Sequence, residues 1–240
     1  MDVVITGIGL KSCLGSLPTT WSSIIQGKSG IKSRQLFDQL SAYPLGLISS
    51  QPSRIGISTQ NVLDDTLKDA ALEVPLKKTG VVIGSSRGCQ SIWENIATHN
   101  QQDNSYNTAA NWLQTLPHQP AIITASYLQT TAPVLAPMAA CATGIWALAR
   151  GYELIQTRGC DRVIAGEVEA PISPLTLAAF ERMGALATTG CYPFDRQREG
   201  LVLGEGGAMF VLETAELAKS RLAKAYGKIK SFGLTCDAYH

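Results

Sequence analysis

Short apolar runs alternate with amphipathic stretches along this chain, a pattern typical of strands that alternate with helices. We predict strands at residues 3–9, 79–86, 133–138, 162–166, 208–213 and 227–234. We predict helices at residues 19–26, 61–72, 91–99, 120–128, 142–155, 178–183 and 215–223. The polar stretch 100–108 is predicted to be an exposed loop. This alternation favours an α/β architecture with helices on both faces of the sheet.

Length and composition narrow the class of protein. With 240 residues and 45% hydrophobic content, the chain can bury a substantial core, and we predict a single domain over residues 1–240. The formal net charge of +1 gives no electrostatic argument for binding nucleic acid or an anionic membrane. No apolar run reaches the roughly 20 residues that a membrane helix needs. We therefore expect a soluble, cytoplasmic protein.

Neither the cysteines nor the glycine-rich turns form a known binding motif. The six cysteines show no CxxC pair and no Cys/His cluster at zinc spacing, so we predict no metal site. We expect reduced thiols, because the chain is large and shows no signal peptide. The run Gly7-Ile8-Gly9 lacks the third glycine of a dinucleotide-binding loop. Glu205 places a carboxylate where a phosphate-binding loop needs donors, so we predict no nucleotide cofactor.

Cys141 stands out because it lies where an apolar stretch meets a long amphipathic helix, in the run AACATG at 139–144. Backbone N–H groups and the dipole at a helix N-terminus stabilise a thiolate. The neighbouring alanines and Gly144 leave room for a substrate beside the sulfur. This arrangement is typical of a nucleophile elbow built around cysteine. The competing interpretation is a buried core cysteine, but the surrounding residues favour a nucleophile.

The elbow and further motifs resemble, in order along the chain, those of the β-ketoacyl-acyl-carrier-protein synthases, the condensing enzymes of the thiolase fold. ACATG at 140–144 resembles their active-site cysteine motif, and VITGIG at 4–9 their opening strand. The segment from Trp21 to GKSGI at 27–31 is similar to a helix end of the family. Further similar segments are VIGS at 82–85, AGxxE at 165–169, YPFDxxRxGxxxGEG at 192–206 and DAYH at 237–240. The chain is therefore identified as a member of this family.

The resemblance implies a thiolase-like layered fold with a mixed sheet, and a two-step reaction in fatty-acid or polyketide synthesis. A thiolate takes an acyl group from a carrier thioester, and malonyl-carrier then decarboxylates and attacks the acyl-enzyme. Cys141 would accept the acyl group, and its own backbone N–H would supply one donor of the oxyanion hole. Asp195, Arg198 and Glu205 are expected to support the loop around the site. The resemblance implies no cofactor.

The resemblance also shows that this sequence lacks the second half of the family and the catalytic residues in it. Family members are considerably longer, and their second half carries two catalytic histidines, a supporting lysine and a Gly-Phe-Gly loop. None of the three histidines of this chain, His99, His118 and His240, matches those residues. We therefore expect an N-terminal lobe with the C-terminal lobe absent, and an activity that is incomplete in this chain alone. The alternative is a non-catalytic ketosynthase-like scaffold, a partner subunit or a truncated remnant.

An uncovered lobe would expose apolar surface. We therefore expect a homodimer, a complementary second-lobe chain, or poor stability, with an acyl-carrier protein as the further partner. The basic residues near the end of the sequence fit either a solvated helix face or a patch for an acidic carrier. They are Lys219, Arg221, Lys224, Lys228 and Lys230.

Three residues besides Cys141 are candidate substrate contacts: Arg87, Trp112 and Met138. Arg87 stands near where many family members place an apolar residue of the acyl tunnel. An arginine there could shorten the pocket, favour a polar acyl group, or point to solvent, because burying it unpaired is costly. Trp112 could reach the pocket of a neighbouring subunit or could pack structurally. Met138 lies three residues before Cys141.

Overall fold

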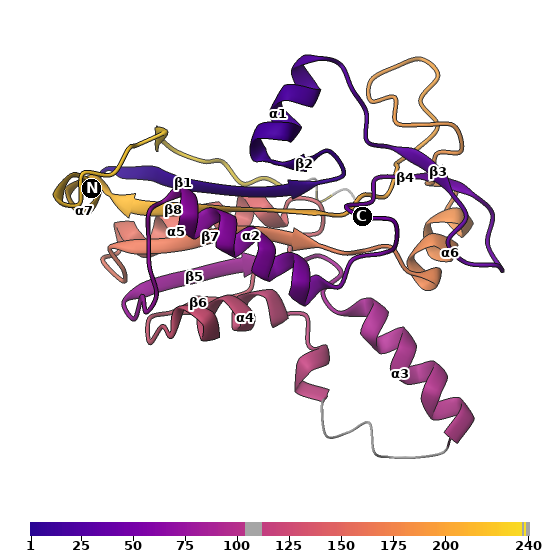
Figure 1. Ribbon diagram of the computed structural model, residues 1–240, viewed down its shortest axis with the longest axis horizontal. Helices are drawn as coiled ribbons and strands as arrows, with labels where there is room; N and C mark the ends of the chain where they lie inside the picture. Colours follow the sequence, from indigo (N-terminus) through magenta and orange to yellow (C-terminus); the bar gives the residue numbers. More distant parts are fainter. Residues whose placement is uncertain (104–111, 237, 239–240) are drawn as a thin grey trace.

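A mixed seven-stranded sheet forms the centre of the computed structural model, which describes residues 1–103, 112–236 and 238 (Figure 1). The strand order is β2-β1-β8-β7-β5-β6, and β9 pairs with β1. Strand β5 runs parallel to β6 and β7, whereas the other pairs are antiparallel. The strands are β1 (Val3–Ser12), β2 (Gly15–Ser16), β5 (Thr79–Gly84), β6 (Val134–Leu135), β7 (Arg162–Glu169), β8 (Gly206–Thr214) and β9 (Gly227–Ile229). A small second sheet pairs β3 (Lys32–Arg34) with β4 (Tyr43–Leu45).

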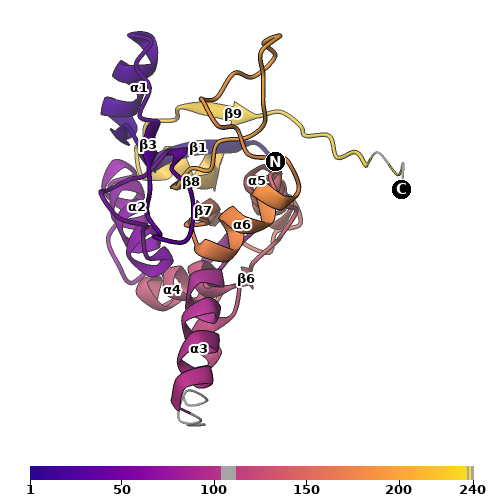
Figure 2. The ribbon, with the colours of Figure 1, turned by 90° about the vertical axis from the view of Figure 1, so that its right-hand side faces the viewer.

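Helices cover both faces of the large sheet, which confirms the predicted α/β architecture. Helices α2 (Ile55–Asp69) and α4 (Gln119–Leu128) pack on one face, and α5 (Thr143–Gln156) packs on the other (Figure 2). Helix α3 extends away from the sheet (Figure 1). The remaining helices are α1 (Leu17–Ile25), α3 (Gln90–Asp103), α6 (Pro174–Arg182) and α7 (Ala215–Ser220). Within the described ranges, none of the helices has the length and apolar character to cross a bilayer.

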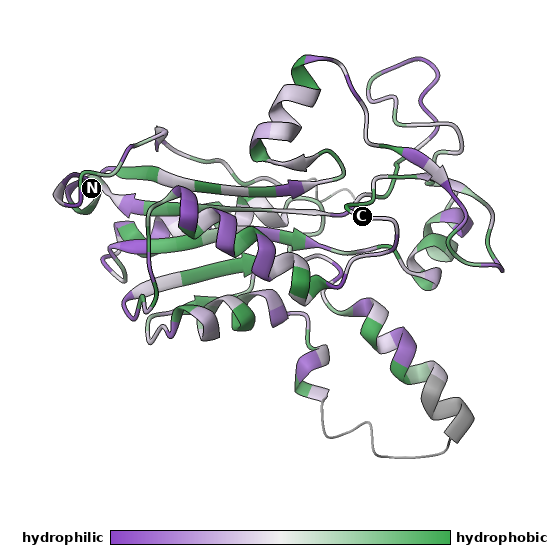
Figure 3. Cartoon of the chain, in the orientation of Figure 1, coloured by the Kyte–Doolittle hydropathy of each residue, from purple (hydrophilic) through white to green (hydrophobic). Residues whose placement is uncertain are grey.

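Strand β7 explains why the strands of this sheet are continuous apolar runs in the sequence. Successive side chains of a strand point to opposite faces. Ile164 and Val168 lie in the core under α2 and α4, and Val163 and Ala165 lie in the core under α5. Because both faces are covered, neither set can be polar. The central strands are accordingly largely hydrophobic along their length (Figure 3).

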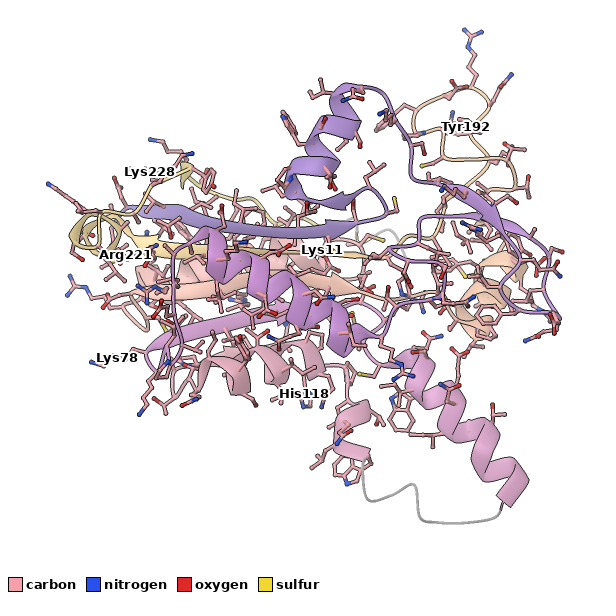
Figure 4. All side chains as sticks on the ribbon, viewed as in Figure 1. Lys11, Lys78, His118, Tyr192, Arg221 and Lys228 are labelled. Atoms are coloured by element: carbon pink, nitrogen blue, oxygen red, sulfur yellow. The ribbon has the colours of Figure 1, made fainter. Side chains whose placement is uncertain are left out.

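One buried carboxylate joins several elements at the end of the sheet opposite Cys141. Glu213 of β8 is fully buried and accepts hydrogen bonds from Thr6 of β1 (2.6 Å) and Arg162 of β7 (2.7 Å). Arg221, beside α7 (Figure 4), forms an ion pair with the same carboxylate at 2.7 Å. Burial would raise the pKa of Glu213, but hydrogen bonds from Arg221, Thr6 and Arg162 outweigh it and hold that pKa below its ordinary value.

The structure corrects several predicted boundaries. Helix α2 begins at Ile55, ahead of the predicted start at residue 61, and β9 ends at Ile229 instead of residue 234. Helix α3 continues to Asp103, so residues 100–103 are helical, while 104–108 of the predicted loop lie outside the described residues. The pairing of β3 with β4 is absent from our predictions because both strands are very short.

We predict that Glu213→Gln destabilises the protein by about 3 kcal/mol, because it leaves Arg162 and Arg221 without their counter-charge. Urea unfolding followed by circular dichroism measures the loss. The matched control Glu216→Gln, at the exposed start of α7, should change stability by less than about 0.5 kcal/mol. Equal effects of the two substitutions would contradict this account.

The pH dependence of unfolding gives a second readout of the same carboxylate. Because the native pKa of Glu213 is lowered, its contribution is present above the unfolded pKa and is lost as pH falls through the native pKa. The stability difference between wild type and Glu213→Gln should therefore shrink on acidification.

Candidate active site

Cys141 lies exposed in a tight turn at the start of α5. The preceding residue, Ala140, has a φ of 48°, in the left-handed region that costs a non-glycine residue roughly 1 kcal/mol. The Thr143 hydroxyl holds this turn: it accepts from the Ala139 N–H (3.0 Å) and donates to the Ala140 carbonyl (2.6 Å). Thr143 itself is fully buried. The sulfur is therefore presented at a helix N-terminus by a strained and specifically bonded turn.

The turn rests directly on the end of β5 at Gly84. A Cβ atom at Gly84 would lie 2.3 Å from Cγ2 of Thr143 and 2.5 Å from the Pro137 carbonyl oxygen. Neither distance is compatible with a side chain, so glycine is required for this close approach. Strand β6 ends at Leu135, and Pro137 belongs to the irregular segment that leads to the turn.

A cavity of about 540 Å³ opens beside Cys141, between the first turns of α5 and the strands β1, β7 and β8. Apolar side chains form much of its wall: Leu10, Ile145, Leu148 and Phe210. Its titratable groups, apart from the thiol, are Lys11, Glu167, Glu169 and Glu205. The site thus combines an accessible thiol, an apolar surface and several carboxyl groups.

Glu167 and Glu169 lie at the end of β7, next to the helix that carries the thiol. Glu169 accepts a hydrogen bond from the Ser86 N–H. Burial raises the pKa of Glu167 to about 7, and a hydrogen bond to Glu169 and the charge of Glu169 add to the rise. A hydrogen bond from the Gly144 backbone opposes it. Glu167 is therefore partly protonated at neutral pH.

The other cavity groups have structural partners. Glu205 is buried and accepts hydrogen bonds from the Ser53 N–H (2.6 Å), the Ser53 hydroxyl (2.8 Å) and the Ile48 N–H (3.3 Å). It thereby ties the 48–53 segment to the start of β8. Lys11, labelled on β1 in Figure 4, forms an ion pair with Asp65 at 2.7 Å.

The loop that precedes Glu205 is held by local bonds. Asp195 accepts from the Gln197 N–H (2.7 Å), and Arg198 donates to the Asp195 carbonyl (2.8 Å). Hydrogen bonds from Thr189 and Thr188 lower the pKa of Glu199 to about 2. The loop stands away from the sheet, as the position of Tyr192 in Figure 4 shows, and Phe194 on it is fully exposed.

The three predicted substrate contacts do not line the Cys141 cavity. Arg87 is half-buried and places its guanidinium over the Phe180 ring of α6, with 5.0 Å to the ring centre. Trp112 and Met138 are exposed, at 53% and 67%. Within the described residues, no group of three or more His, Cys, Asp or Glu side chains is arranged to hold a metal ion.

Glu167 was not among the site residues that we predicted. Its spacing from Glu169 could have indicated it, because residues two positions apart in a strand share a face. We ended the predicted strand at Gly166, so these carboxylates were not assigned to a face of the sheet.

Comparisons with known proteins identify the family of this chain. Residues 58–218 match the family model described as the β-ketoacyl synthase N-terminal domain. The 3-oxoacyl-[acyl-carrier-protein] synthase 2 of Staphylococcus aureus strain COL is 30% identical over 264 residues. That alignment covers 99% of this chain and 64% of the relative, so the chain spans less than two thirds of its length.

Two solved structures have the same fold. A β-ketoacyl synthase from Burkholderia phymatum STM815 aligns with a TM-score of 0.85 and 25% identity, over 100% of this chain and 65% of its own. A chain in a complex of a type II PKS acyl-carrier protein with its ketosynthase aligns with a TM-score of 0.88 and 24% identity. That alignment covers 100% of this chain and 64% of the other. The predicted thiolase-like, N-terminal-lobe fold is confirmed by these alignments.

We predict that Thr143→Val destabilises the protein by about 1–3 kcal/mol, because it leaves the Ala139 N–H without its acceptor. The released turn should also slow the reaction of Cys141 with iodoacetamide, while the exposed Cys191 reacts as before. Peptide mass spectrometry measures both thiols in one sample. Thr143→Ser, which keeps the hydroxyl, should behave nearly as wild type, and a loss as large as that of the valine variant would refute the assigned role.

Proposed function

Because the chain belongs to the β-ketoacyl synthase family, we propose that Cys141 is the acyl-accepting nucleophile of a 3-oxoacyl-[acyl-carrier-protein] synthase-type acyltransferase. The observation that carries this proposal is the position of Cys141: an exposed thiol at the N-terminus of α5, on the wall of a partly apolar cavity. An exposed thiol in such a setting is accessible to an acyl thioester, and the thiolate is its nucleophilic form.

The proposed step is a thioester exchange. The Cys141 sulfur attacks the carbonyl carbon of an acyl-carrier thioester, and the bond from that carbon to the carrier sulfur breaks. The oxyanion of the tetrahedral intermediate would be stabilised by the backbone N–H of Cys141 as one donor. Leu10, Ile145, Leu148 and Phe210 would contact the acyl chain.

The family resemblance implies a second step, decarboxylative condensation with malonyl-carrier. The resemblance assigns it to two histidines that have no match among the three histidines of this sequence. For this chain alone we therefore propose only the first step, acyl transfer to Cys141. Fatty-acid and polyketide synthesis are both represented among the related proteins.

We infer that an acyl-carrier protein delivers the acyl group. The related complex contains a ketosynthase bound to its acyl-carrier protein. The basic residues near the end of the sequence offer less free charge for that partner than their number suggests. Arg221 pairs with Glu213 and Lys228 pairs with Asp2, while Lys224 lies over the Tyr226 ring.

Acylation of Cys141 tests the proposed function directly. Incubation with an acyl-carrier thioester should add the mass of the acyl group to the peptide that contains Cys141, and Cys141→Ala should abolish that addition. The exposed Cys191 and Cys236 serve as internal controls for non-specific acylation. Equal labelling of all three thiols, or none on Cys141, would instead favour a non-catalytic ketosynthase-like partner subunit.

We also propose a homodimer that pairs β6 of two copies. This strand lies at the open edge of the sheet, and its Val134 and Leu135 are 37% and 39% exposed. Light scattering after size-exclusion chromatography should give twice the chain mass of 25.6 kDa. Leu135→Lys should give monomers, whereas Leu222→Lys, at a 92% exposed position, should not. A stable wild-type monomer at high concentration would rule the homodimer out.

A further inference from the structure

Two carboxyl groups of β7 point toward α5, the helix that begins next to Cys141. Residues two positions apart in a strand share a face, so Glu167 and Glu169 point to the side on which Val163 and Ala165 pack under α5. Both glutamates line the cavity that Cys141 lines. The fold therefore brings an acid pair and a thiol to one end of the sheet.

The Glu167 carboxyl group lies against the first turn of α5. A Cβ atom at Gly144 would be only 2.8 Å from Glu167 Oε2. Gly144 follows Cys141 by three residues, so the carboxyl group is within one helical turn of the sulfur along the chain. A residue with a side chain at 144 would push Glu167 out of this position.

The pair needs one proton to satisfy its buried oxygens. Glu169 accepts from the Ser86 N–H, yet its Oε2 is buried and has no donor anywhere in the described part of the chain. A buried acceptor without a donor is costly. A proton on Glu167, whose carboxyl group hydrogen-bonds to Glu169, would give the pair a donor, in agreement with the raised pKa of Glu167. At neutral pH much of the protein thus holds an acidic proton on Glu167 in the cavity.

We propose that Glu167 is a further catalytic residue, the general acid that protonates the departing thiolate when an acyl group moves to Cys141. This inference rests on the acyl transfer proposed above. Cys141 enters as the thiolate, its proton having passed to solvent. Its sulfur bonds to the acyl carbon, the bond to the carrier sulfur breaks with its electron pair on that sulfur, and the Glu167 proton passes to it. Water then returns a proton to the Glu167 carboxylate.

The other groups around the cavity are less suited to this task. Lys11 of β1 is paired with Asp65, and the oxygens of Glu205, next to β8, accept from Ser53 and Ile48. Glu169 is occupied as the acceptor of the Ser86 N–H. A general acid works best when its pKa lies near the working pH, and Glu167 meets that condition.

A comparison of two thioesters with the same acyl group tests the proton transfer. An N-acetylcysteamine thioester releases a basic alkyl thiolate that needs a proton, whereas an S-phenyl thioester releases a weakly basic thiolate that does not. Glu167→Gln should slow acylation of Cys141 by the alkyl thioester roughly 100-fold and by the phenyl thioester less than about threefold. Glu153→Gln, at the far end of α5, is the matched control and should change neither rate.

Two readouts separate this role from a structural one. At pH 6.5 iodoacetamide should alkylate Cys141 at a similar rate in wild type and in Glu167→Gln, which shows that the thiol and its turn are intact. In wild type, the ratio of alkyl-thioester acylation to alkylation should fall tenfold per pH unit above about pH 7, as Glu167 loses its proton. In Glu167→Gln that ratio should not vary with pH.

The outcomes distinguish this inference from the proposed function. If wild type accepts the acyl group and Glu167→Gln slows both thioesters equally, or neither, the proton-donor role is wrong and acyl transfer stands. If neither thioester acylates Cys141 in wild type above the Cys141→Ala background, the acyl-transfer proposal itself fails, and this inference fails with it.

Discussion

The packing of the first turn of α5 against the ends of β5 and β7 is the contact on which the site depends. Two glycines permit it: Gly84 accommodates the methyl group of Thr143, and Gly144 accommodates the carboxyl group of Glu167. With a side chain at either position the helix would have to move away from the sheet. The strands beneath are buried on both faces and cannot adjust without opening the core. The position of the Cys141 sulfur is thus fixed by the sheet.

The same contact decides which negative charge occupies the start of the helix. The N-terminus of α5 favours negative charge, and both the Cys141 sulfur and the Glu167 carboxyl group lie near it. When Glu167 is protonated it adds no negative charge there, although its carboxyl group still accepts a hydrogen bond from the Gly144 backbone. Burial of Glu167 thus lowers the negative charge at the start of α5 and retains a proton in the cavity.

The sequence allowed the order of strands and helices, the family and the position of Cys141 to be predicted, because periodicity and motifs are local properties. Other features depend on contacts between distant segments. The start of α2 was missed because Ile55, Ile57 and Thr59 are β-branched and disfavour a helix locally, while burial of Ile55 and Thr59 stabilises it. Arg87 was placed near the acyl pocket by analogy, but only the tertiary fold reveals Phe180 as its neighbour. The protonation of Glu167 likewise depends on burial that no local pattern encodes.

The antiparallel pairing of β1 with β8 joins Val3 to Thr214, nearly the full length of the chain apart. Contacts of such sequence separation form slowly, because the long intervening loop must close first. On a ribosome that adds roughly 5–20 residues per second, β1 waits about 10–40 seconds for its neighbour. During that interval β1 has only its two-residue pairing with the short strand β2. Most of the apolar length of β1 therefore gains its sheet neighbours only when nearly the whole chain has been synthesised.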